Sequence, residues 1–307
     1  MLTVCAIKAQ AQLPISGVHY AAGLAGIKGG SLPGPGLYAG DNNFFCYGTS
    51  DLVPDYKSFI YLQAPQLTWI TPWKILGANY GMNVMVPLIY NDTRYKEFQG
   101  SPSIPTPIVL SEGLNRFGVG DIEIEPLLLS WHLQQFDFTA GYGFWAPTGD
   151  YNNSSLVNLG DGLWTQMITL GGTWYLDHEK TWAFSILNHF EFNSQVPGIL
   201  IGYQSPASPA PVYHPSIPCS TYTMEWGASK TVYKKIDVGI VGYYQQQFMY
   251  QNGAAAFNDS QVAAIGPEIR SEFPGIGLAV SLRYEYQFLA DNSPHGQMVD
   301  FRISKQF

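Results

Sequence analysis

Acidic side chains spaced two residues apart are the first candidates for chemistry in this chain. Asp121, Glu123 and Glu125 alternate with Ile122 and Ile124. In an extended strand, alternate side chains share one face and stand about 7 Å apart, so the three carboxylates would form a row. Paired carboxylates serve acid–base catalysis or bind hard cations such as Ca²⁺. This spacing is wide for a metal cage and suits the lining of a wall better.

Other groups capable of chemistry lack the spacing that known mechanisms need. The 6 histidines show no metal-ligand spacing, and neither a G-x-S-x-G motif nor a P-loop is present. No sequence pattern pairs His189 with a serine. We therefore expect no enzyme activity, no catalytic residue, no metal and no cofactor. The alternative is a barrel enzyme that acts on lipid through a Ser–His pair, as a membrane phospholipase does.

The composition excludes several classes of protein. Of the 307 residues, 12% are charged and 15% are aromatic, whereas soluble domains carry about 25% charged residues. A surface that faces lipid needs few charges and many aromatic side chains at its interfaces. No apolar run reaches the roughly 18 residues of a transmembrane helix. The net charge of −8 and the absence of a basic cluster argue against nucleic acid as a partner.

Alternation of apolar and polar residues predicts the strands that would position these side chains. In 276–288, every second residue from Ile276 to Phe288 is apolar, and Arg283 and Glu285 lie on the other face. About twelve segments alternate in this way. They are 36–47, 57–71, 78–92, 118–131, 136–147, 163–176, 181–193, 222–233, 236–248, 262–273, 276–288 and 297–307.

The connections between these segments alternate between long and short. Outer-membrane barrels show this asymmetry, with long extracellular loops and short periplasmic turns. The sequence therefore predicts an all-β fold over 36–307, a transmembrane antiparallel up-and-down β-barrel of about twelve strands. Its expected location is the outer membrane of a Gram-negative bacterium.

The parity of the alternation assigns polar residues to the lumen of this barrel. The candidate solute path consists of Asp121, Glu123, Glu125, Trp145, His189, Glu191, Glu268, Arg270, Arg283, Glu285, Asp300 and Arg302. Trp131, Tyr175 and Tyr243 fall on the same face, which would make the interior less watery. Two interpretations of the charged residues stay open. They could brace the wall at about 0.2–1 kcal/mol per cross-strand pair, or they could orient solutes.

The chain divides into three expected parts. Residues 1–11 end in Ala9-Gln10-Ala11, which resembles a signal-peptidase site, so they are expected to be a signal-peptide remnant. Residues 12–35 do not alternate and contain Gly26-Ile27-Lys28-Gly29-Gly30. Our hypothesis is that this segment enters the barrel and plugs the lumen, and a periplasmic tail is the alternative. Residues 36–307 form the barrel.

The last predicted strand carries Phe301, Ile303 and Phe307 on its outward face. A terminal Phe that closes an alternating strand looks like the recognition signal of the barrel-assembly machinery. Expected partners are therefore this machinery, outer-membrane lipid and a small-molecule solute, with a monomer favoured. Cys46 and Cys219 form an even pair in an exported chain, and a disulfide between them stays open.

Short motifs follow one another through most of the chain. They are Gly26-Ile27-Lys28, Ser31-Leu32-Pro33, Pro35-Gly36-Leu37-Tyr38, Gln63-Ala64-Pro65, Ile75-Leu76-Gly77, Tyr80-Gly81, Val86-Pro87, Gly118-Val119-Gly120-Asp121, Pro126-Leu127, Trp131, Ala146-Pro147-Thr148-Gly149-Asp150-Tyr151 and Phe307. In this order they resemble an outer-membrane transporter-like family named for the meta-pathway of phenol degradation. The chain departs from the family pattern at Gly34 and at Gln66, where a proline and a basic residue are common.

The resemblance implies an outer-membrane channel or transporter for the diffusion or uptake of small molecules, often aromatic or hydrophobic. The departure at Gln66 weakens any inference that the same solute is handled, and the solute stays open. Besides the lipid-directed enzyme, a structural surface barrel without a transport role is an alternative.

Overall fold

The computed structural model describes residues 18–51, 55–99, 108–152, 157–194, 196–200, 213–216, 220–233, 235–248 and 260–307. Strands dominate these residues, and the one helical element among them is a 3-10 turn, Pro274–Ile276 (η1). No helix in the described ranges is long and apolar enough to cross a membrane.

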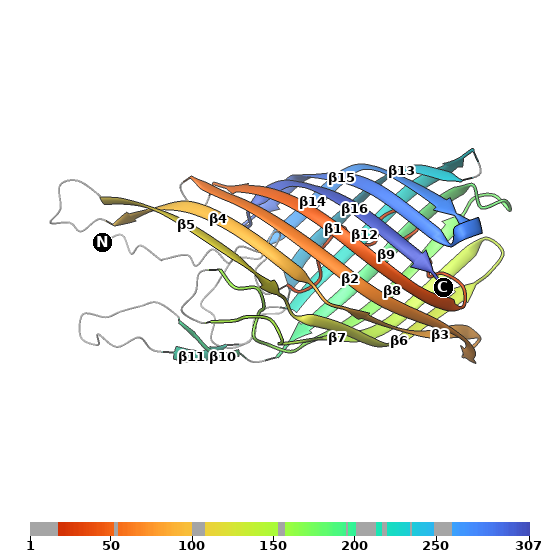
Figure 1. The fold of residues 1–307 in the computed structure, drawn as a ribbon, viewed down its shortest axis with the longest axis horizontal. Helices are drawn as coiled ribbons and strands as arrows, with labels where there is room; N and C mark the ends of the chain where they lie inside the picture. The colour runs from red at the N-terminus through yellow and green to blue at the C-terminus, as the bar shows by residue number, and fades with distance from the viewer. Residues whose placement is uncertain are drawn as a thin grey trace.

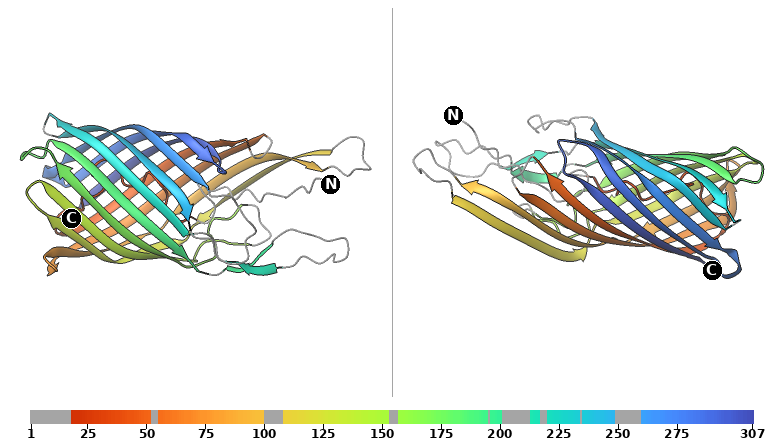
Figure 2. Two further views of the ribbon diagram at one scale, coloured as in Figure 1. Left: turned by 180° about the vertical axis from the view of Figure 1, so that it is seen from behind. Right: turned by 90° about the horizontal axis from the view of Figure 1, so that it is seen from above.

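The strands form one antiparallel sheet that closes on itself (Figures 1 and 2). They are β1 (Gly36–Ser50), β2 (Tyr56–Ile75), β3 (Ala78–Met85), β4 (Leu88–Gln99), β5 (Ile108–Val119), β6 (Ile122–His132), β7 (Phe136–Ala146), β8 (Thr165–Tyr175), β9 (Trp182–Asn193), β12 (Ser220–Val232), β13 (Ile236–Phe248), β14 (Gln261–Phe273), β15 (Leu278–Asp291) and β16 (His295–Gln306). β1 pairs with both β16 and β2, which closes the barrel. A separate hairpin of β10 (Val196–Leu200) and β11 (Tyr213–Ser216) lies in the predicted loop 194–221.

Two of the passages that the chain makes from one end of the barrel to the other, here called crossings, are each divided into two strands. β2 pairs with β4 along its first part and with β3 along its last part, so β3 and β4 are one crossing broken at Val86-Pro87. Pro87 has no N–H to give to the ladder, and the backbone N–H of Gly120 donates instead to its carbonyl oxygen at 2.8 Å. β5 and β6 form the second interrupted crossing. The described strands thus make 12 crossings, which confirms the predicted transmembrane-type antiparallel barrel.

The hairpin of β4 and β5 departs from the regular wall. β5 pairs with β4 and with no other strand in the described residues. Figure 1 shows this hairpin projecting beyond the barrel at the end opposite the C-terminus. The C-terminus lies with the short turns, which defines that end as the periplasmic end.

Side chains alternate across the wall largely as predicted. Leu282 and Tyr284 are exposed on the outer surface, while Arg283 and Glu285 are buried inside. The outer surface is therefore apolar and the interior is polar. This is the distribution that a lipid-facing barrel requires.

The predicted lumen position of Trp131 was wrong. The pairing of β6 with β7 shifts register between Ile124 and Leu127, at Pro126. A bulge of this kind adds a residue and reverses the faces beyond it. Trp131 consequently pairs with the outward Phe138, and its indole N–H donates to the carbonyl oxygen of Leu76 at 3.0 Å.

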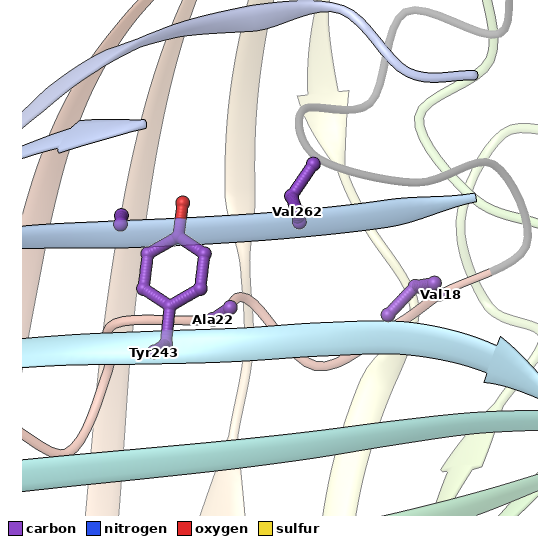
Figure 3. Packing of buried hydrophobic residues seen from close by; sticks show 5 residues of the cluster. Val18, Ala22, Tyr243 and Val262 are labelled. Carbon is purple, nitrogen blue, oxygen red and sulfur yellow. The ribbon is translucent and has the colours of Figure 1, made fainter. Parts of the chain in front are cut away.

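Residues 18–35, here called the N-terminal segment, run from inside the barrel to its periplasmic end, where residues 33–35 are exposed. Val18 and Ala22 pack against Tyr243 and Val262 on the inner faces of β13 and β14 (Figure 3). Ile27 is 1% exposed. The segment continues at the periplasmic end into β1. The segment 1–17, which includes the expected signal-peptide remnant, lies outside the described residues, as does Cys219.

Candidate functional site

Carboxylates of the barrel wall hold the backbone of the N-terminal segment. Oε1 of Glu191 on β9 accepts hydrogen bonds from the N–H groups of His19 at 3.2 Å and Tyr20 at 3.0 Å. Glu225 on β12 accepts from Gly23 at 2.8 Å and Ala25 at 2.7 Å. Hydrogen bonds to charged groups contribute about 1.5–3 kcal/mol each, more than those between neutral groups.

The periplasmic half of the segment is held in the same way. Oε2 of Glu268 accepts from the N–H of Ile27 at 2.9 Å. The ammonium group of Lys28 lies 2.7 Å from Oδ2 of Asp237. Acidic residues of the wall thus bind the segment directly. For two of them, Glu191 and Glu268, sequence parity had predicted only a position in the lumen.

The strands β14, β15 and β16 carry a buried charge network. Arg283, whose side chain is 3% exposed, lies 3.4 Å from Glu268, 3.3 Å from Glu285 and 2.7 Å from Asp300. Opposite charges alternate from strand to strand in this row, because Arg283 is in register with Glu268 on one side and Asp300 on the other. This geometry supports the interpretation in which the charges brace the wall.

His19 sits in an acidic pocket at the extracellular half of the segment. Its Nε2 lies 2.9 Å from Oδ2 of Asp121 and 3.7 Å from Oδ2 of Asp161, and its ring stacks on Trp145 at 5.4 Å. Burial lowers the pKa of His19, but the charge of Asp161 and the hydrogen bond that the ring donates to Asp121 outweigh burial, so the net pKa is raised. Burial also raises the pKa of Asp161, to about 6.

The hydroxyl of Thr165, the imidazole of His19 and the carboxylate of Asp121 form a hydrogen-bonded chain. Oγ1 of Thr165 lies 2.9 Å from Nδ1 of His19, and Asp121 contacts the other ring nitrogen. Nucleophilic triads use these groups in this order. However, Thr165 is 0% exposed and donates its hydroxyl hydrogen to Oδ1 of Asn193 at 2.6 Å. The arrangement therefore anchors the segment and presents no nucleophile to a lipid.

His189 lies deeper in the lumen, beneath the aromatic ring of Tyr20. The ring centroids are 3.8 Å apart, and Nδ1 of His189 lies 3.1 Å from Oγ1 of Thr169. Its Nε2 is buried without a hydrogen-bond partner. No group of three His, Cys, Asp or Glu in the described ranges is arranged to hold a metal ion.

Described residues of the segment line two cavities. The larger, of about 650 Å³, extends to the periplasmic end at Gly277 and Gln306. The smaller, of about 80 Å³, lies among Ile60, Ala64, Met85, Trp145 and Leu159. Tyr20 and Leu24 line both cavities. These two side chains therefore form the constriction between them.

The candidate solute-path residues divide between these cavities. The larger cavity is lined by Glu123, Glu125, His189, Glu268, Arg270, Arg283, Asp300 and Arg302. Asp121 and Trp145 line the smaller one, whereas Glu191 and Glu285 line neither. No pattern in the sequence indicated His19, Tyr20 and Leu24, because the segment that carries them does not alternate. Asp161 was missed because it lies in a predicted loop.

Phe301, Ile303 and Phe307 point away from the lumen, and 43%, 38% and 74% of their surfaces are exposed. This matches the predicted outward face of the last strand. Their role as an assembly signal stays a prediction.

A closed barrel with an apolar outer surface and a polar interior defines the class of outer-membrane β-barrels, whose location is the outer membrane of Gram-negative bacteria. The model of the family described as "Putative MetA-pathway of phenol degradation" matches residues 43–303. The chain belongs to this family, and the resemblance found in the motifs is confirmed.

Solved structures of other proteins share this fold. An outer membrane channel from Pseudomonas putida F1 is 14% identical, with a TM-score of 0.71 over 90% of this chain and 97% of that one. The beta domain of the Bordetella autotransporter BrkA is 12% identical, with a TM-score of 0.51 over 89% of this chain and 100% of that domain. No curated protein matches the chain in sequence.

Proposed function

We propose that the chain is a channel for the diffusion or uptake of small apolar or aromatic molecules across the outer membrane. The observation that carries this proposal is the pair of cavities that meet at Tyr20 and Leu24. A structural barrel would fill its lumen with side chains, whereas this one keeps about 650 Å³ open. The aromatic and aliphatic walls of the smaller cavity suit an apolar solute.

The N-terminal segment acts in this proposal as a plug. It is bound to the wall by Glu191, Glu225 and Glu268, so a wide water-filled pore cannot form while it is in place. A solute would pass from the smaller cavity to the larger one when Tyr20 and Leu24 move apart. The candidate solute path then runs along Trp145, His189 and the charged residues of the larger cavity.

Single-channel conductance in a planar bilayer tests this proposal. The refolded chain should show small or rare conductance steps, and removal of residues 18–32 should produce steady, larger steps. Equal conductance before and after the deletion would remove the plug. Cells that express the chain should take up labelled phenol faster than cells without it. Equal uptake would contradict the transport role.

The proposal includes partners and excludes catalysis. The chain would contact outer-membrane lipid through its apolar surface, and the barrel-assembly machinery through the strand that ends at Phe307. We propose a monomer without enzyme activity and without a cofactor. Release of fatty acid from phospholipid vesicles by the refolded chain, lost in Thr165→Val, would favour the lipid-directed enzyme instead.

A further inference from the structure

Two successive rows of inward side chains on β14, β15 and β16 differ in charge balance. The upper row is Glu268, Arg283 and Asp300, in which the cation lies between two anions. The next row towards the periplasm is Arg270, Ser281 and Arg302. Arg270 and Arg302 lie two strands apart in this row, so their Cα atoms are about 10 Å from each other at the usual strand spacing. The small Ser281 lies between them.

The cations of the larger cavity are paired with carboxylates, apart from Arg302. Arg270 lies 2.6 Å from Glu272, and Lys180 lies 3.2 Å from Asp137. Lys28 and Arg283 have the partners given above. Arg302 lines the cavity. In the described part of the chain its side chain has no hydrogen bond and no ion pair, and the charges of Asp300 and Glu268 act on it from a longer distance. A partly buried cation without a carboxylate in direct contact is unfavourable in a protein unless a ligand supplies one.

The remainder of the cavity determines where an anion could lie. Glu123 and Glu125 line the opposite wall on β6 and offer no positive charge to a carboxylate. Leu24 of the N-terminal segment, Leu128 of β6 and Leu187 of β9 also line the cavity and give it an apolar surface. The volume of about 650 Å³ falls in the range of about 300–1,000 Å³ that is typical of small-molecule sites.

We propose that Arg302, with Arg270 beside it, forms a subsite for the carboxylate of a small amphipathic anion, whose apolar body lies against Leu24, Leu128 and Leu187. The inference rests on the proposed channel function and deepens it, since it names the chemical class of a solute. Arg302 binds the carboxylate, and Arg270 adds a second positive charge while it keeps its bond to Glu272. Such a solute would pause at the periplasmic end of the lumen.

Isothermal titration calorimetry of the full chain in detergent tests this subsite. Benzoate is the probe, benzyl alcohol is the neutral molecule of similar shape, and inorganic phosphate is the anion without an apolar body. Benzoate should bind about tenfold or more tightly than either of the others, because a hydrogen bond to a charged group is worth at least this factor. Equal affinity for benzyl alcohol or for phosphate would overturn the proposal.

Two variants assign the binding to Arg302. Arg302→Gln should weaken benzoate binding about tenfold or more and leave benzyl alcohol unchanged. Arg94→Gln is the matched control, because Arg94 lies on β4 with a side chain 70% exposed, far from the cavity. Heat-modifiable migration in a detergent gel confirms that each variant is folded. Unchanged benzoate affinity in folded Arg302→Gln would overturn the assignment.

Two measurements distinguish failure of the subsite from failure of the channel function. Phenol uptake by cells reports on the channel, and benzoate binding in detergent reports on the subsite. Binding that depends on Arg302 without any uptake would refute the channel and keep the subsite. Uptake of phenol without benzoate binding would refute the subsite and keep the channel.

Discussion

The backbone N–H of Ala25 donates a hydrogen bond of 2.7 Å to Oε2 of Glu225, which joins the N-terminal segment to β12. The other oxygen of this carboxylate accepts from Gly23 at 2.8 Å and from Leu24 at 3.1 Å. One side chain of the wall thus binds three consecutive amides of a segment about 200 residues earlier in the chain. Several contacts of this type determine how firmly the lumen is closed.

Glu225→Gln should loosen the segment. A neutral amide keeps the shape of the carboxylate but offers one acceptor oxygen in place of two, with a cost of about 1.5–3 kcal/mol. The rate of tryptic cleavage after Lys28, followed by mass spectrometry, should rise about tenfold or more. Glu179→Gln is the control, since Glu179 lies exposed in a turn. Equal cleavage rates in both variants would show that Glu225 does not hold the segment.

Gly26→Ala should displace the segment from the wall. Gly26 has φ of +68°, and a Cβ there would lie 2.5 Å from Nη1 of Arg283 and from Oε2 of Glu268. The left-handed conformation alone costs about 1–2 kcal/mol for a residue with a Cβ. We expect larger conductance steps and faster cleavage after Lys28. Gly34→Ala should change neither, because a Cβ at Gly34 meets nothing within 4 Å.

Attachment of the segment should weaken as the pH rises. The raised pKa of His19 means that its ion pair with Asp121 is fully present below about 6.5 and is lost as pH rises through the folded value. Burial raises the pKa of Asp161 to about 6, so Asp161 adds its charge to the attraction on His19 only above about that pH.

Conductance recorded between about pH 5.5 and 8.5, across the range where histidine titrates, measures this effect. Open events should become more frequent at high pH in the unmodified chain, and His19→Gln should flatten the dependence. His178→Gln should retain it, because His178 lies in an exposed turn. The same pH dependence in His19→Gln would assign the effect to other groups.

Leu24→Ala should widen the constriction between the two cavities. Leu24 lines both of them, and truncation removes three carbon atoms where they meet. We expect phenol uptake by cells to rise several-fold without the large conductance of the deletion. Leu32→Ala serves as the control, since Leu32 lines the larger cavity alone. A rise of the same size in both variants would place the limiting step elsewhere.

Removal of Phe307 should impair assembly in cells more than folding in vitro. Its side chain is 74% exposed on the outward face of the last strand, so it contributes little packing to the finished barrel. The amount of heat-modifiable chain in the outer membrane should fall several-fold, while refolding into detergent stays unchanged. If both decrease together, Phe307 acts through stability and is not a recognition signal.

The strands and their faces could be predicted from the sequence, because lipid and lumen impose opposite polarity on alternate residues. For example, Arg283 and Glu285 face the lumen and Leu282 faces outward, as their alternation in the sequence predicts. The prediction failed at Trp131, where a bulge at Pro126 adds a residue that alternation cannot register. A prediction from alternation assumes that every second residue has the same face. At a bulge two residues of one strand lie opposite one residue of its neighbour, so the assumption fails there.

The sequence by itself thus determined the class of fold, the membrane-facing surface and the set of charges inside the barrel. The tertiary structure alone decided that Glu191, Glu225 and Glu268 bind a backbone and that Tyr20 and Leu24 separate two cavities. It also decided that the side chain of Arg302 has no ion-pair partner among the described residues. These relationships join residues far apart in the chain, across a closed barrel. Local periodicity carries no information about such contacts, which depend on how strands align and where the N-terminal segment lies.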